Sequence, residues 1–267
     1  MSAPRRIRNL ELHVTHACNL ACESCSHYSN HAHKGDLDPS LADEWLGAWS
    51  QRVQPEVFSL LGGEPTIHPR FADFIPIARR HFPLAHLRII TNGFFLDRHP
   101  LLRDVLRADP DVTVYVSVHH ESPEYVGKVW DNLQMLKRWA EEFGIRYATA
   151  LSARGWTRRY TGYGAEMQPF GDGNPRASWE QCPARTCPQI HEGKFWKCAP
   201  LAYLPMQNER FGLGEAWSPY LAYRPLSPDC SDDALDEFLA REDEAMCAMC
   251  PSQPRPFAIP VPLRRRT

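Results

Sequence analysis

Apolar positions in the first 150 residues alternate between two spacings. Short apolar or alternating runs predict strands, and runs with apolar side chains three and four positions apart predict helices. The predicted strands are 10–14, 57–61, 87–91, 112–118 and 145–151. The predicted helices are 39–52, 71–82 with an interruption near Pro76, 101–108 and 124–143. This alternation predicts an α/β fold in which helical crossovers join parallel strands.

The final third of the chain has a different character. Residues 154–176 are rich in Gly, Arg and Tyr and show no period, which predicts a long loop able to line or cover a site. A hairpin is expected around Glu192-Gly193, with strands at 189–190 and 195–197, followed by an acidic helix at 232–244. Most of the 24 prolines lie after residue 165, so this part is held by something other than regular structure.

Length and charge limit the classes of function. A chain of 267 residues allows one sizeable core, or a barrel of roughly 200 residues with a small appendage. The formal charge of -2 gives no overall positive field, so neither a nucleic acid nor a membrane partner is expected. The basic cluster Arg264, Arg265 and Arg266 is expected to be a solvated tail. No apolar stretch reaches membrane-spanning length, and we expect a soluble cytoplasmic protein.

Nine cysteines change this picture, because their odd number and clustered spacing favour metal binding over disulfides. Cys18, Cys22 and Cys25 lie within eight residues after the first predicted strand. Three thiolates can bind three irons of a cubane and leave the fourth iron open to a ligand. Zinc is the alternative, with a fourth ligand from one of four nearby histidines. These are His16, His27, His31 and His33.

The cysteine triplet, together with Gly62-Gly63-Glu64-Pro65 after the second strand, resembles the radical S-adenosylmethionine (SAM) superfamily. The resemblance implies a partial (β/α)6 TIM-like barrel over residues 1–177 and a SAM-binding [4Fe–4S] cluster on the triplet. Reductive cleavage of SAM would then give a 5′-deoxyadenosyl radical that removes a hydrogen atom from the substrate. The SAM contacts implied are Gly62, Gly63, Glu64, Pro65, Thr91, Asn92 and Ser117.

One position departs from the family pattern. Many members have an aromatic residue immediately before the third cysteine, where it packs on the adenine of SAM. This chain has Ser24 there, and His27 or Tyr28 is expected to take that role.

A second cysteine set resembles the auxiliary domain called SPASM, or its truncated form, twitch. Residues 178–255 would form this domain with its small β-hairpin and helix, and 256–267 a tail. The six remaining cysteines are too few for the two clusters of SPASM, so one auxiliary [4Fe–4S] cluster is expected. Cys187 competes with the first member of the preferred ligand set, and two ligand pairs would also suit zinc. The preferred ligands are Cys182, Cys198, Cys247 and Cys250.

Two cysteines are left over, Cys230 and one of Cys182 and Cys187. Each is either a small buried apolar residue or a thiol that donates a hydrogen atom to a substrate radical, which would make the protein an epimerase. His119, His120 and Glu121 follow the fourth strand and are candidate bases. The segment between the two predicted domains offers anchors for a substrate phosphate or carboxylate. These are Arg154, Arg158, Arg159 and Tyr160.

The function expected from the resemblance is dehydrogenation, epimerisation or rearrangement of a small polar molecule. An external one-electron donor such as flavodoxin or ferredoxin would supply the electron. Modification of a ribosomally made peptide and a non-catalytic iron–sulfur or zinc protein are the alternatives.

Overall fold

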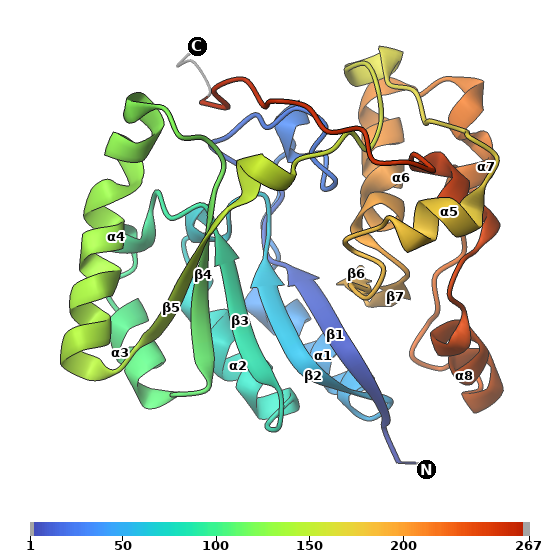
Figure 1. Ribbon diagram of the computed structural model, residues 1–267. Coiled ribbons are helices and arrows are strands. Elements are labelled where there is room, and N and C mark those ends of the chain that lie inside the picture. The colour runs from blue at the N-terminus through green and yellow to red at the C-terminus, as the bar shows by residue number, and fades with distance from the viewer. Residues whose placement is uncertain (1–2, 264–267) are drawn as a thin grey trace.

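A seven-stranded sheet organises the computed structural model, which describes residues 3–263 (Figure 1). Its strand order is β5-β4-β3-β2-β1-β6-β7. The strands are β1 Arg5–His13, β2 Val53–Leu61, β3 His86–Thr91, β4 Val112–Val118, β5 Arg146–Leu151, β6 Gln189–His191 and β7 Lys194–Trp196. The expected basic cluster at 264–266 lies outside the described residues.

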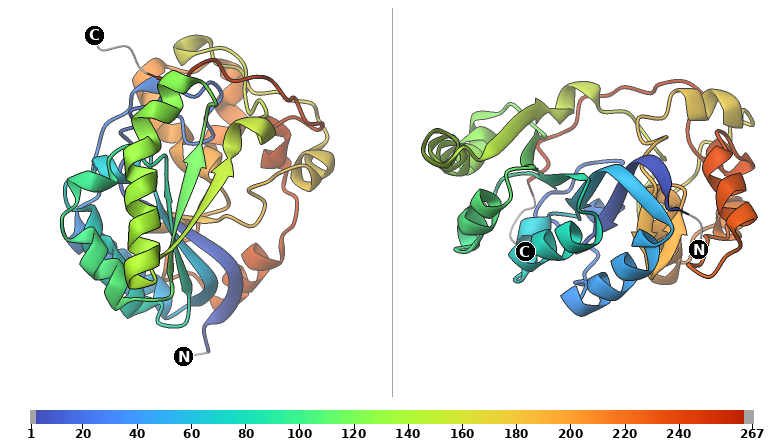
Figure 2. Two further views of the ribbon diagram at one scale, coloured as in Figure 1. Left: turned by 60° about the vertical axis from the view of Figure 1, so that its left-hand side comes forward. Right: turned by 90° about the horizontal axis from the view of Figure 1, so that it is seen from below.

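Helices α1–α4 follow β1–β4 in turn and line one face of the curved sheet (Figure 2). They are α1 Pro39–Ser50, α2 Phe74–His81, α3 Leu102–Ala108 and α4 Pro123–Phe143. Four more helices lie beside the hairpin β6–β7, at the other edge of the sheet from β5 (Figure 1). These are α5 Pro175–Glu180, α6 Ala199–Phe211, α7 Ser218–Leu221 and α8 Asp232–Ala240.

The predicted α/β partial barrel is confirmed, with one difference in detail. Neighbouring strands from β1 to β5 pair in parallel, but the sixth parallel strand, β6, pairs with β1 at Glu11↔Gln189. It comes from the hairpin and therefore lies at the opposite edge from β5. No apolar run that could form a strand lies between β5 and residue 189. No further strand is therefore available to extend the sheet beyond β5.

Three local predictions need correction. The helix expected at 71–82 is a 3₁₀ turn, Phe71–Asp73, followed by α2. Pro76 lies in the first turn of α2, where its missing N–H costs nothing, so it does not interrupt the helix. The acidic helix expected to reach residue 244 ends at Ala240.

Strand β1 begins five residues before the predicted position, because its polar residues also belong to it. Leu10 and Leu12 face the helices, whereas Asn9, Glu11 and His13 are buried on the other face. There the Glu11 carboxylate accepts a hydrogen bond from Gln189 Nε2, and burial raises the pKa of Glu11. This hydrogen bond and the β1–β6 pairing anchor the hairpin to the core sheet.

Four histidines surround Tyr203 of α6 where the hairpin meets β1; His13 is buried, and His16, His27 and His191 are half-buried. The ring centroid of His13 lies 4.9 Å from that of His27 and 4.6 Å from that of Tyr203. His191 lies 4.9 Å from Tyr203 and 5.7 Å from His16. Burial lowers the pKa of His16, His27 and His191 to about 4 and that of His13 still further below its usual value. These imidazoles are therefore neutral at pH 7.

The loop that carries the cysteine triplet docks on the turn after β2 through backbone contacts. The N–H groups of Gly63 and Glu64 donate to the carbonyls of Thr15 and Ala17 at 2.7 and 2.8 Å. A Cβ on Gly63 would lie 2.3 Å from the Ala17 oxygen, and one on Gly62 would lie 2.7 Å from the Thr15 oxygen. Only glycine allows this approach.

Replacing Gly63 therefore tests the docking. We expect Gly63→Ala to lower the free energy of unfolding by at least about 2 kcal/mol, because backbone atoms must move apart. Gly127→Ala on α4 is the matched control, since nothing lies within 4 Å of its added Cβ. It should raise stability by about 0.5–1 kcal/mol. Urea titration of both variants measures the difference, and wild-type stability of Gly63→Ala would contradict the docking.

The histidines predict acid lability. A histidine in the unfolded chain takes up a proton near pH 6.5, whereas the buried ones stay neutral to about pH 4. The unfolded state then binds more protons, so stability falls as the pH drops from 6.5 towards 4, by up to about 1.4 kcal/mol per pH unit for each histidine. Urea midpoints at pH 7, 6 and 5 measure this slope. His191→Gln should flatten it by one proton, and an unchanged slope would show that His191 does not contribute.

Candidate functional site

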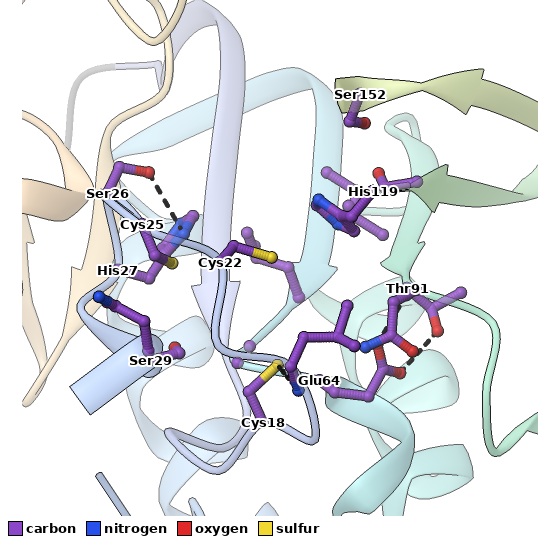
Figure 3. A pocket seen from close by; sticks show the side chains of 18 of the residues that line it. Cys18, Cys22, Cys25, Ser26, His27, Ser29, Glu64, Thr91, His119 and Ser152 are labelled. Atoms are coloured by element: carbon purple, nitrogen blue, oxygen red, sulfur yellow. Dashed lines mark hydrogen bonds between the residues drawn. The ribbon is translucent and has the colours of Figure 1, made fainter. Parts of the chain in front are cut away.

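A cavity of about 230 Å³ lies at the carboxyl ends of β2–β4 and is lined by the cysteine triplet (Figure 3). Residues from five separate segments face it, as expected for the carboxyl edge of a parallel sheet. The predicted site residues that line it are Cys18, Cys22, Cys25, His27, Gly62, Gly63, Glu64, Thr91, Asn92, Ser117 and His119. The structure therefore gathers nearly all of the predicted SAM contacts in one place.

The backbone around Cys25 is shaped to receive negative charge. Ser24 and Tyr28 have positive φ values of 61° and 55°, which turn successive N–H groups toward one point. The N–H groups of His27, Ser29 and Asn30 hydrogen-bond to the Cys25 sulfur and oppose the effect of burial, which raises its pKa. The N–H group of Leu20 donates to Cys18 Sγ at 3.4 Å. This donor set fits a thiolate-held iron–sulfur cluster, because hydrogen bonds to sulfur stabilise its negative charge.

Glu64 connects the ends of two strands. Its carboxylate accepts hydrogen bonds from Thr91 Oγ1 and from the Asn92 N–H, both at 2.6 Å. It also accepts from the Thr66 N–H at 3.1 Å. Burial raises the pKa of Glu64, and these hydrogen bonds oppose that shift. Glu64 thus positions the β3 end beside the cysteine loop, where Asn92 Nδ2 donates to Asn19 at 2.8 Å.

The aromatic side chain missing at position 24 has a counterpart on another segment. Trp156 lines the cavity, and its Nε1 donates to the Glu23 carbonyl at 2.7 Å. Its ring meets that of His119 edge to face at 5.5 Å between centroids. Burial lowers the pKa of His119 to about 4, and its Nδ1 has no hydrogen-bond partner among residues 3–263. Tyr28, one of the expected replacements, does not line the cavity.

Sequence reasoning missed Trp156 and Ser152, both of which face the cavity. One feature of the sequence pointed to Trp156, because the aperiodic segment 154–176 was expected to line or cover a site. Ser152 lies just before that segment. The structure shows why the segment lines the cavity: Ser24 Oγ accepts a hydrogen bond from the Arg159 N–H at 2.6 Å. Arg158 adds an ion pair with Glu23. Ser24 therefore attaches this segment to the cysteine loop.

The C-terminal segment passes over the same loop (Figure 1). The Ala21 N–H donates to the Pro262 carbonyl at 2.7 Å, and the Arg158 N–H donates to the Arg255 carbonyl at 3.0 Å. The Arg158 guanidinium lies 4.1 Å from the centre of the Phe257 ring. The cysteine loop is thus held from above by two segments distant in sequence.

A second, small cavity of about 40 Å³ collects four other cysteines among apolar side chains such as Leu201, Met246 and Met249. Burial raises the pKa of Cys250 to about 12 and raises that of Cys198 well above its usual value. The four are Cys182, Cys198, Cys247 and Cys250.

Cys187 lies apart from these four. It lines a different cavity of about 660 Å³ together with Arg88 and Cys182. Burial, and then the nearby Glu11 carboxylate, raise the pKa of Cys187 to about 12.

Several candidate residues do not line the cavity that holds the cysteine triplet. Glu121 is exposed and pairs with Arg154 at 3.0 Å. Cys230 lies at the opposite end of the sheet, where Arg52 Nη2 donates to its carbonyl at 2.9 Å. Pro65 begins a 3₁₀ turn and does not face the cavity. We do not carry these residues into the proposed site.

The remaining histidine candidates have other partners. His31 Nε2 lies 3.2 Å from the Tyr160 hydroxyl, and His33 Nε2 lies 2.6 Å from Gln207 Oε1. His120 Nδ1 accepts a hydrogen bond from the Ser122 N–H at 3.0 Å. Across residues 3–263, no three His, Cys, Asp or Glu side chains lie close enough together to bind a single metal ion. A four-iron cluster differs from a single ion, because each cysteine binds a different iron. In the same part of the chain, no helix is long and apolar enough to cross a bilayer.

Comparisons with known proteins place these features in context. The chain is 32% identical over 114 residues to the tungsten-containing aldehyde ferredoxin oxidoreductase cofactor-modifying protein of Pyrococcus furiosus, covering 42% of this chain and 31% of that protein. It is 29% identical over 111 residues to the mycofactocin maturase MftC of Mycobacterium ulcerans, covering 42% and 29%. The chain thus spans about a third of the length of these curated relatives.

Among the similar solved structures is one that covers nearly all of this chain. The structure of BtrN in complex with AdoMet and 2-DOIA matches 92% of this chain and 94% of its own, with a TM-score of 0.52 and 18% sequence identity. A family model described as the Radical SAM superfamily matches residues 12–152. That region is more than half of the chain and supplies every residue that lines the 230 Å³ cavity except Trp156. The chain therefore belongs to the radical SAM superfamily, whose members are enzymes that use a [4Fe–4S] cluster and SAM.

Proposed function

We propose that this enzyme uses the 230 Å³ cavity to bind a [4Fe–4S] cluster and SAM, and that it abstracts a hydrogen atom from a small polar substrate. One observation carries the proposal: the cysteine triplet, the Gly-Gly-Glu turn and the polar ends of β3 and β4 face a single cavity. The outcome would be dehydrogenation, epimerisation or rearrangement. When bound, the cluster and SAM together supply a carbon-centred radical.

Different residues of the chain would bind the cluster and SAM. Cys18, Cys22 and Cys25 would hold the cluster. The backbone of Gly62 and Gly63 would contact the methionine part of SAM, while Glu64 positions the ends of β3 and of the cysteine loop. The other polar contacts proposed are Thr91, Asn92 and Ser117, which line the cavity.

We assign the adenine-facing surface to Trp156, with His119 packed against its edge. Trp156 is held by its hydrogen bond to Glu23, which leaves the ring face available to a flat ligand. His119 is neutral at pH 7 and has a ring nitrogen without a partner in the described structure. It is therefore the candidate base for a substrate proton.

We propose that the second cavity holds one auxiliary [4Fe–4S] cluster, as in a twitch domain. Cys182, Cys198, Cys247 and Cys250 line it together, whereas Cys187 lies elsewhere, and this favours Cys182 as the fourth ligand. The cluster would accept the second electron of an oxidation. An external one-electron carrier such as flavodoxin or ferredoxin would provide the first.

Arg159 is the proposed anchor for a substrate carboxylate or phosphate. Arg154 and Arg158 are paired with Glu121 and Glu23. The guanidinium of Arg159 has no hydrogen-bond or ion-pair partner among residues 3–263, and its charge opposes the raised pKa of Cys250. A small substrate is supported by the overall similarity to BtrN, whose structure contains a ligand named 2-DOIA.

A peptide-modifying enzyme is the second candidate function. The similarity to the mycofactocin maturase favours it, because that relative is named as a maturase. Product analysis with small polar molecules and with peptides distinguishes the two.

Metal analysis tests the proposed function. Anaerobically reconstituted wild-type protein should contain about eight irons, and Cys18/Cys22/Cys25→Ala about four, with loss of any SAM effect on the EPR signal. Cys198/Cys247/Cys250→Ala should also contain about four but keep the response to SAM. Cys187→Ser is the matched control and should keep all the iron. Stoichiometric zinc with little iron would refute both cluster assignments.

Trp156→Leu tests the adenine surface. Losing an aromatic contact worth about 0.5–1.5 kcal/mol should weaken SAM binding roughly three- to tenfold. Isothermal titration with reconstituted protein measures the dissociation constant. Trp130→Leu is the control, because Trp130 is 53% exposed on α4, away from the cavity. Equal SAM affinity in all three proteins would exclude Trp156 as the adenine surface.

A further inference from the structure

Tyr28 connects the loop that carries the cysteine triplet with the start of α6. Its N–H donates to the Cys25 carbonyl at 3.0 Å, and its hydroxyl donates to the Pro200 carbonyl at 3.3 Å. Pro200 follows Cys198 by two residues, at the start of α6. A single side chain thus connects the loop of the cysteine triplet with the loop of the four-cysteine cavity.

The position of Tyr28 is strongly constrained. The residue is 1% exposed and has a left-handed φ of 55°, a conformation that is costly for a bulky side chain. Its ring centroid lies 5.5 Å from that of Tyr160, whose hydroxyl donates to Asn30 at 3.0 Å. Such a conformation persists only where the surroundings hold it, and at functional sites it is often retained for a purpose.

Tyr220 of α7 provides a comparison residue, because its ring packs against that of Trp217 at 6.1 Å between centroids.

We propose that Tyr28 is the positioning residue that couples the two clusters electronically. This inference rests on the proposed function, because it requires both clusters. With both clusters bound, the donor would be oxidised by one electron and the acceptor reduced by one. The Tyr28 ring and its hydrogen bond to the Pro200 carbonyl would provide the path, because that peptide leads to Cys198. Tyr28 itself stays neutral and reduced, because the carbonyl that accepts its hydrogen bond is no base for the phenol proton.

Two substitutions separate the hydrogen bond from the ring. Tyr28→Phe keeps the ring and removes the hydrogen bond to Pro200, and Tyr28→Leu also removes the ring. Rapid reduction followed by freeze-quench EPR measures how fast the two clusters reach redox equilibrium, without substrate turnover. We expect equilibration to be several-fold slower in Tyr28→Phe and slower again in Tyr28→Leu, with the iron content unchanged. Tyr220→Phe is the matched control and should equilibrate at the wild-type rate.

The outcomes distinguish this inference from the proposed function. Wild-type protein with about four irons would refute the auxiliary cluster itself, and with it this inference. About eight irons in all variants with equal equilibration rates would overturn the role of Tyr28 and leave both clusters intact. If Tyr28→Leu loses iron, Tyr28→Phe alone decides. Tyr160→Phe, which removes the hydrogen bond to Asn30 but not the one to Pro200, should behave as wild type.

Discussion

Backbone contact between the cysteine loop and the Gly62–Gly63 turn is the constraint on which the rest of the site depends. It brings the two segments so close that neither glycine can carry a side chain. Once the loop is docked, Asn19 meets Asn92 and the cysteine triplet faces the ends of β3 and β4. These glycines therefore do more than let a cofactor approach. They bring together the two motifs that the cofactor needs, and Glu64 extends the same connection to β3.

Three distant segments then converge on the docked loop. The segment around Arg159 attaches to Ser24, the C-terminal segment attaches to Ala21, and the start of α6 receives the Tyr28 hydroxyl. The loop therefore contacts both the part of the chain around β1–β5 and the C-terminal part, residues 178–255. Strand β6 of the C-terminal part pairs with β1 in the same sheet. The position of the auxiliary cysteines relative to the triplet follows from these contacts.

Local chemistry decided what could be predicted from the sequence. The strands and helices up to residue 151 follow from periodicity, and the cysteine triplet with Gly62-Gly63-Glu64 follows from residue types that few other roles require. Contacts between distant residues gave no local signal. Trp156 could not be assigned to the cavity, because its partner Glu23 is 133 residues away. The first half of β1 was not predicted as a strand, because it contains polar residues. Asn9 and Glu11 are buried there by a hairpin that begins near residue 189. For the same reason, the sequence did not show which of Cys182 and Cys187 lies with Cys198, Cys247 and Cys250.

The partly buried cysteines imply that metal binding at these positions would be energetically linked to the fold. Burial raises the pKa of Cys25, Cys198 and Cys250, so without metal the fold favours neutral thiols at these positions. Iron requires thiolates, and binding it must therefore release protons and offset the cost of burying negative charge. Backbone N–H groups offset part of that cost at Cys25, whereas the four-cysteine cavity is lined mainly by apolar side chains. The fold of the auxiliary part should consequently depend more strongly on its metal than the partial barrel depends on the cysteine triplet, because β1–β5 and their helices have a large apolar core of their own.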